Sequence, residues 1–141
     1  MTIQPQTAII IGVLLLALVT VESGGYFLTR VVRGHVEANL LQRNFFRAGH
    51  AHAAVLLVLG IAVLIATDLA GFTDGWLAWV ARTLVPVAAI LMPAGFFLSV
   101  LGKDPQRPSR LIILLWLGVT SLTIGLLVAG VGMIVAGASA V

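Results

Sequence analysis

Four long apolar runs dominate the sequence, and they restrict the possible fold more than any other feature. They cover about residues 8–29, 48–67, 76–101 and 111–137. Each run has roughly 20 residues or more, which is the length that an α-helix needs to cross a hydrocarbon layer about 30 Å thick. The runs are continuous rather than alternating, and this excludes a transmembrane β-barrel. The sequence therefore predicts an all-α membrane protein with four transmembrane helices in a single domain, residues 1–141.

The scarcity of charge agrees with this class. The chain is 60% hydrophobic and 9% charged, whereas an ordinary soluble domain is about 25% charged. The 8 basic and 5 acidic residues are too few to cover the surface of a soluble globule of 141 residues. A water-soluble globular enzyme and a disordered chain are both excluded. The absence of cysteine also excludes disulfides and thiolate metal sites.

The basic residues predict the orientation of the helices. Seven of the eight lie in two loops, between the first and second runs and between the third and fourth: Arg30, Arg33, Arg43, Arg47, Lys103, Arg107 and Arg110. In a chain that crosses a membrane four times these two loops share one side, and loops rich in Lys and Arg face the cytoplasm. We therefore expect a multi-pass protein of the bacterial cytoplasmic (inner) membrane with both termini outside. We expect the chain to contact the lipid bilayer and not to bind nucleic acid.

The links between the runs predict how the helices are connected. The link Arg30–Arg47 is longer than a turn, and Val32, Val36 and Leu40 recur in it at helical spacing. This pattern predicts a short amphipathic helix lying at the interface; the alternative is that the flanking helices extend into the headgroup region. The other two links are short, which favours antiparallel neighbours and an up-down-up-down four-helix bundle.

Small residues form one stripe on the fourth run. They alternate at intervals of three and four: Gly118, Ser121, Gly125, Ala129, Gly132 and Ala136. Lipid gives helices no hydrophobic reason to associate, so close approach of backbones at small residues holds membrane helices together. The stripe predicts either internal packing or a seam with a second copy or a membrane complex through the face of Gly118, Gly125 and Gly132.

Three ionisable residues inside the runs are the candidate functional residues. Glu22 lies eight residues before Arg30, roughly 12 Å along a helix. His50 and His52 lie near the start of the second run, so all three are expected in the cytoplasmic half of neighbouring antiparallel helices. Tyr26 follows Glu22 by one turn. A carboxylate with imidazoles can bind a transition metal, hold a haem or pass a proton.

Helical geometry limits what the two histidines can do together. His50 and His52 are about 200° apart on one helix, so they cannot both reach a single ion from a regular helix. One of them could face Glu22 while the other faces a cofactor or the interface. The structural alternative is a hydrogen-bonded pair of Glu22 and a histidine that joins two helices. Glu22, His50 and His52 are thus candidate metal ligands, and the two histidines are candidate cofactor-binding residues.

Arg82 is the remaining charge inside an apolar run. It lies about six residues inside the outer end of the third run, so it is expected to snorkel outward or to pair with Asp68 or Asp74. We expect its role to be structural. No catalytic residue is predicted, because the sequence contains no P-loop, no dinucleotide-binding fingerprint and no zinc-protease motif.

Two resemblances follow from these motifs. Residues 45–53, with Gly-His-Ala-His-Ala at their end, and Glu22–Tyr26 upstream resemble a group of small, uncharacterised four-helix membrane proteins of actinobacterial type. That resemblance covers most of the chain and implies no activity. The segment His50–Gly60 is also similar to the His-x-His helix of haem–copper oxidase-like proteins, where a histidine ligates haem. The other ligand histidines of that family are absent here, so a bis-histidine haem would need a second copy.

Three functions are compatible with this pattern. The first is a non-enzymatic membrane protein that assembles with itself or with a larger membrane complex. The second is a haem- or metal-binding electron carrier that uses His50 or His52 with Glu22. The third is a proton-coupled small-molecule transporter that uses Glu22. One acid in the first of four helices superficially resembles the small multidrug resistance transporters, although this chain is longer and has a stronger charge bias. We take the first as the main prediction.

Overall fold

Residues 2–140 are described by a computed structural model, and their regular structure is entirely helical. The elements are α1 (Pro5–Val32), α2 (Leu40–Leu69), α3 (Gly75–Ser99) and α4 (Ile113–Ala138), with a short 3₁₀ turn, η1 (Arg110–Ile112), directly before α4. By length and composition, four helices are long and apolar enough to cross a membrane. The prediction of an all-α chain with four long apolar helices is confirmed.

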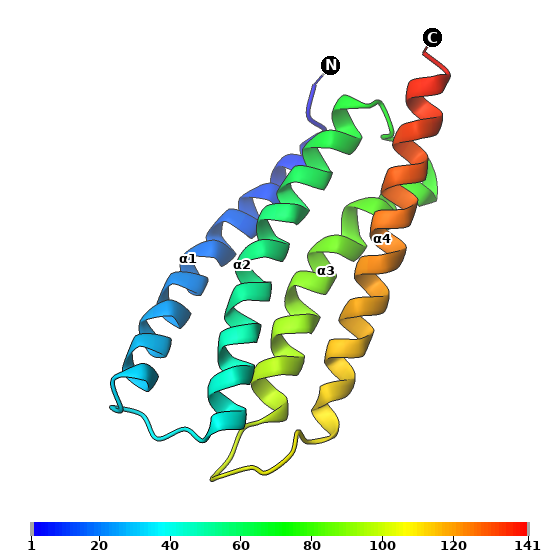
Figure 1. Cartoon of the computed structure of the whole chain (residues 1–141). Helices are drawn as coiled ribbons and strands as arrows, with labels where there is room; N and C mark the ends of the chain where they lie inside the picture. The colour runs from blue at the N-terminus through cyan, green and yellow to red at the C-terminus, as the bar shows by residue number, and fades with distance from the viewer. Residues whose placement is uncertain (1, 141) are drawn as a thin grey trace.

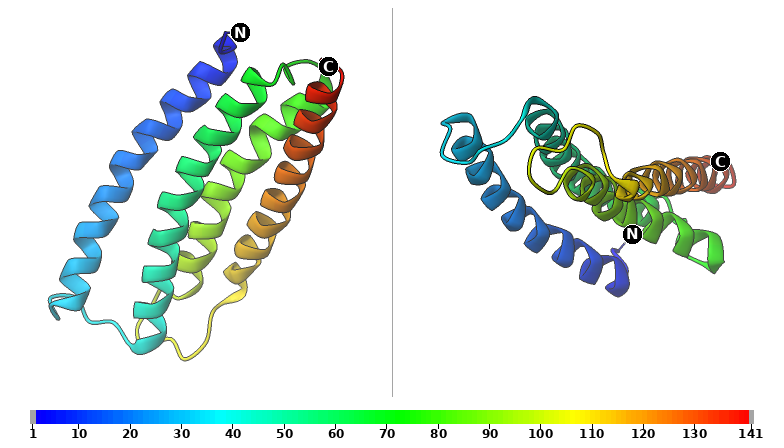
Figure 2. Two further views of the ribbon diagram at one scale, coloured as in Figure 1. Left: turned by 45° about the horizontal axis from the view of Figure 1, so that its top comes forward. Right: turned by 90° about the horizontal axis from the view of Figure 1, so that it is seen from below.

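The helices stand side by side in the order α1, α2, α3, α4 (Figures 1 and 2). Both ends of the chain lie at one end of the molecule, and the loops 33–39 and 100–109 lie at the other (Figure 1). α1 packs mainly on α2, and α4 packs mainly on α3. The two central helices supply most of the buried apolar core, and one of its clusters consists of Leu14, Leu56, Leu57, Leu64, Ala89 and Met92. Few residues of α1 and α4 are therefore buried.

The first loop differs from its prediction. α1 continues to Val32, α2 already begins at Leu40, and residues 33–39 between them are irregular. The predicted interfacial amphipathic helix is therefore wrong, and the flanking helices extend instead. α2 begins early because Asn39 and Gln42 form a capping box: the Asn39 side chain accepts from the Gln42 backbone nitrogen, and Gln42 accepts from that of Asn39.

The small-residue stripe of α4 is an internal contact. A Cβ added at Gly118 would lie 2.8 Å from the backbone nitrogen of Met92 on α3. One added at Gly132 would lie 2.5 Å from the ring of Phe72, and Gly125 is buried against α3. Internal packing, one of the two predicted alternatives, is therefore observed, and the glycines allow the close approach of the neighbouring segments. The seam with a second copy or a membrane complex through this face stays a prediction.

Candidate functional site

His50 lies at the contact between α1 and α2. A Cβ added at Gly24 would lie 3.4 Å from His50 Nδ1, and one added at Gly25 would lie 3.5 Å from its Cε1. The two adjacent glycines thus leave room for the imidazole ring against the α1 backbone. The Gly24-Gly25 pair was the available sequence signal for this contact, because a glycine inside a helix often marks a close approach.

His52 faces α3 instead. Its ring centroid lies 5.0 Å from that of Phe96, and its Nδ1 lies 2.8 Å from the carbonyl oxygen of Ala48. A carbonyl only accepts, so Nδ1 carries the proton and donates, and Nε2 is left as an acceptor. The two histidines contact different helices, which agrees with their angular separation along α2.

Glu22 and Tyr26 lie on the exposed side of α1. Tyr26 is 69% exposed, and Glu22 is also exposed. Within residues 2–140 the Glu22 carboxylate takes part in no hydrogen bond or ion pair, and no group of three or more His, Cys, Asp or Glu side chains could hold a metal ion. One chain therefore does not bring Glu22 and both histidines into a metal-binding group. Binding of haem or metal by a smaller set stays a prediction.

The hydroxyl groups beside Glu22 are satisfied by their own helix. Thr20 donates to the Ala17 carbonyl oxygen at 2.6 Å, and Ser23 donates to that of Thr20 at 2.6 Å. Thr29 donates to the Tyr26 carbonyl oxygen at 2.7 Å. Such bonds to preceding carbonyls allow a hydroxyl to face lipid at small cost. We call the exposed residues Glu22, Ser23 and Tyr26, which lie within about 100° of one another around the helix, the α1 polar face. Glu22 is its one carboxylate.

A buried ion pair occupies the opposite end of the molecule. Arg82 Nη2 on α3 donates to Asp68 Oδ1 on α2 at 2.9 Å, and both side chains are fully buried. The other donors of Arg82 reach the Thr73 carbonyl oxygen at 2.9 Å and Thr7 Oγ1 at 3.2 Å. The backbone nitrogen of Gln4 donates to Asp68 Oδ2 at 2.7 Å. Of the two predicted alternatives for Arg82, pairing is the observed one.

This network joins three helices near the chain termini. It connects the start of α1, the end of α2 and the first half of α3, and no buried side-chain nitrogen or oxygen within residues 2–140 lacks a partner. Fully satisfied buried charges hold the elements in one arrangement, and removing one partner is costly. Sequence reasoning missed Thr7, although it lies seven residues before the buried Leu14 and so on the same helix face.

A polar cleft of about 390 Å³ lies between the two loops at the other end. The Asn39 side chain donates to Asp104 Oδ1 at 2.8 Å and to the Pro105 carbonyl oxygen at 2.7 Å. Gln42 donates to the carbonyl oxygens of Val100 and Gly102, both at 3.1 Å. The residues that cap α2 thus also hold the second loop. Sequence reasoning missed this network because loop-to-loop contacts carry no periodic signal.

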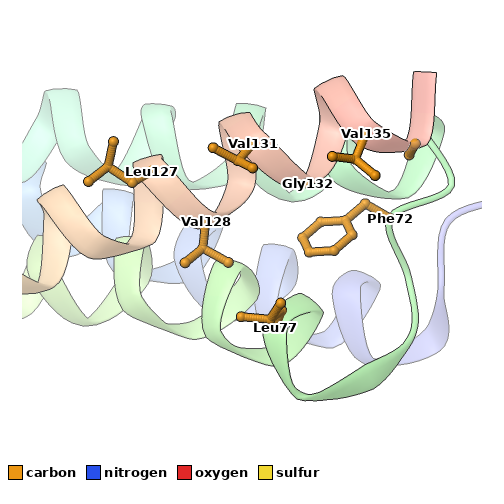
Figure 3. A pocket seen from close by; sticks show the side chains of 8 residues that line it. Phe72, Leu77, Leu127, Val128, Val131, Gly132 and Val135 are labelled. Carbon is orange, nitrogen blue, oxygen red and sulfur yellow. The ribbon is translucent and has the colours of Figure 1, made fainter. Parts of the chain in front are cut away.

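An apolar pocket of about 480 Å³ opens between α3 and α4, near the end that carries the termini. The Phe72 ring lies beside Gly132 on its wall (Figure 3). The other lining residues are aliphatic or small: Leu77, Leu127, Val128, Val131, Val135 and Ala136. It has no polar group that could orient a ligand or take part in a reaction.

The arrangement defines a four-helix protein with apolar outer helices and three separate polar regions: the α1 polar face, the Arg82–Asp68 network and the polar cleft between the loops. Comparison with protein-family models, with curated proteins and with solved structures finds no match to this chain. The two resemblances described for the sequence therefore stay predictions, and function is argued from the residues alone.

Proposed function

We propose that this chain is a small multi-pass membrane protein without an enzymatic role, and that it assembles through the α1 polar face. The observation that carries the proposal is the exposed Glu22 carboxylate, which has no partner within residues 2–140. Ionisable side chains at membrane depth generally face the protein interior, a water-filled cavity or a charged or polar partner, because exposure to hydrocarbon costs several kcal/mol. A second protein surface on α1 would remove that cost.

The proposal places four antiparallel helices across the bacterial inner membrane, with the basic loops in the cytoplasm and both termini outside. The length and composition of the helices support this placement, as does the concentration of Arg and Lys at the end with loops 33–39 and 100–109. α1, with 28 residues, is about 42 Å long, and Glu22 lies roughly 15 Å from its end at Val32. That depth is inside the hydrocarbon region of one leaflet.

A second copy of the chain is the partner that the α1 polar face fits best. Two copies in one membrane have the same orientation, so their α1 helices would run parallel and place equivalent residues at the same depth. The Glu22 carboxylate is an acceptor, and the Tyr26 hydroxyl, one turn away, is a donor. Parallel contact would bring Tyr26 of each copy within reach of Glu22 of the other. The surface is therefore self-complementary.

Replacing Glu22 with leucine tests the assembly. We expect Glu22→Leu to weaken self-association by roughly 5- to 30-fold, the range of about 1–2 kcal/mol measured for polar contacts between membrane helices. Single-molecule photobleaching in lipid bilayers measures the fraction of dimers over a range of protein densities. Val13→Leu, at an exposed apolar position about 180° around the same helix from Glu22, is the control and should leave the dimer fraction unchanged. An unchanged fraction for Glu22→Leu would contradict the proposal.

The geometry of His52 favours a haem- or metal-binding electron carrier as the second candidate. Donation from Nδ1 to Ala48 leaves Nε2 as the coordinating nitrogen, and a backbone carbonyl on the other ring nitrogen is the usual arrangement of metal-binding histidines. Purified protein that carries haem should show a Soret band that His52→Ala removes and His35→Ala, in the exposed loop 33–39, retains. Absence of both the band and bound metal would exclude this candidate.

A further inference from the structure

Two adjoining clefts lie between the ends of α1 and α2 that meet loop 33–39. They measure about 330 and 200 Å³, and we call them together the arginine cleft. Their wall is mostly apolar, and their rim carries three arginines. The lining residues are Leu28, Thr29, Val31, Val32, Arg33, Arg43 and Arg47. Both chain segments contribute cations, since Arg33 follows α1 while Arg43 and Arg47 belong to α2.

The guanidinium groups at the rim are available for an anion. Arg43 Nε donates to the Ala38 carbonyl oxygen at 2.9 Å, which fixes the side chain and leaves its terminal nitrogens to bind elsewhere. Within residues 2–140 none of the three arginines forms an ion pair. The acid of the same loop, Glu37, lines the polar cleft together with Arg43 and does not line the arginine cleft. The lining of the arginine cleft therefore contains three cations and no acid.

We propose that the arginine cleft binds the phosphate of an anionic phospholipid, with an acyl chain of that lipid along the wall of Leu28 and Val32. Guanidinium groups bind phosphate oxygens through paired, charge-assisted hydrogen bonds. Basic pockets between membrane helices on the cytoplasmic side are the recurring sites for anionic headgroups. The inference rests on the membrane placement proposed above and is independent of assembly through Glu22.

The apolar wall distinguishes a lipid from free phosphate. Val32 is 78% exposed, and together with Leu28 it continues the cleft from the arginines toward the apolar part of α1. Burying an acyl chain there would add a favourable hydrophobic contribution to the binding free energy. Inorganic phosphate has no such chain. The site is thus amphipathic, as the lipid is. Arginines at a helix end also reach the headgroup level while their stems stay in the apolar layer.

Native mass spectrometry of the full chain in detergent micelles tests the site. Phosphatidylglycerol is titrated against phosphatidylcholine, with wild type beside the double variant Arg33→Gln/Arg47→Gln. We expect wild type to prefer phosphatidylglycerol and the double variant to bind it more weakly by on the order of tenfold or more, since each arginine near an anionic headgroup contributes a severalfold increase. Because these arginines are exposed, the variant should keep its fold and its dimer fraction, which circular dichroism and photobleaching measure.

The matched control removes the same charge at the same end of the molecule. Arg107 and Arg110 are exposed and line no part of the arginine cleft, so Arg107→Gln/Arg110→Gln should change binding by less than about twofold. Equal losses in both double variants would indicate general surface attraction and overturn the site, as would no loss in either. Inorganic phosphate that binds as tightly as the lipid would overturn the assignment to a phospholipid. A second variant, Val32→Glu, should repel the lipid without removing an arginine, and unchanged binding would also contradict the proposal.

Discussion

Replacing Asp68 with leucine is expected to lower the free energy of unfolding by about 3–5 kcal/mol. The change leaves Arg82 fully buried without its counter-charge. It also removes the acceptor of the Gln4 backbone nitrogen at the start of α1. Unfolding of the protein in detergent micelles, followed by circular dichroism, measures the loss.

A double replacement separates the ion pair from its burial. In Asp68→Leu/Arg82→Met neither charge remains, and exchange of a buried ion pair for apolar residues is often neutral. The double variant should therefore be more stable than Asp68→Leu alone. Asp74→Asn, at an exposed position close by, is the control and should stay within about 0.5 kcal/mol of wild type. A double variant as unstable as the single one would show that Arg82 and Asp68 do not act as a pair.

Replacing Gly95 with alanine is expected to destabilise the protein by about 1–3 kcal/mol or more, by forcing α3 and α4 apart. A Cβ at this position would meet the backbone nitrogen of Leu115 and lie 2.8 Å from its Cα. Backbone atoms cannot rotate away as the end of a flexible side chain can. The same unfolding measurement reports the loss.

The control for Gly95 is a glycine of α4 with free space around it. A Cβ at Gly130 would meet no atom within 4 Å. Gly130→Ala should therefore be neutral or stabilise the helix by about 0.5–1 kcal/mol, because alanine has less backbone entropy to lose. If both substitutions had the same effect, close contact between α3 and α4 at Gly95 would not be the cause.

The sequence predicts the four helices because each run is long, apolar and bounded by charges or turn residues. The start of α2 was predicted at about residue 48, but the helix begins at Leu40. Hydropathy alone does not detect the additional turns, since they contain Arg43, Arg47 and other polar residues. The capping box of Asn39 and Gln42 was the local signal that marks the true start.

The candidate site was predictable only in part, because helical spacing gives a direction on one helix and not the neighbour in that direction. The separation of His50 and His52 could be derived from their spacing. The exposure of Glu22 could not, since it depends on which side of α1 packs against α2. For Arg82, pairing with an aspartate was one of two predicted alternatives. The contacts of Gln4 and Thr7 with this pair could not be predicted, because they depend on where the start of α1 lies relative to α2 and α3.

Site-specific crosslinking in membranes tests the central claim, assembly through the α1 polar face, most directly. The chain has no cysteine, so each introduced cysteine reports on one position. Ser23→Cys lies on the α1 polar face, and the control Thr123→Cys lies exposed on α4 with the same kind of hydroxyl-to-carbonyl bond. Oxidation should join Ser23→Cys chains into a covalent dimer, Glu22→Leu should reduce that product, and Thr123→Cys chains should stay uncrosslinked. Equal yields at both positions, or no dimer at Ser23→Cys, would contradict the account.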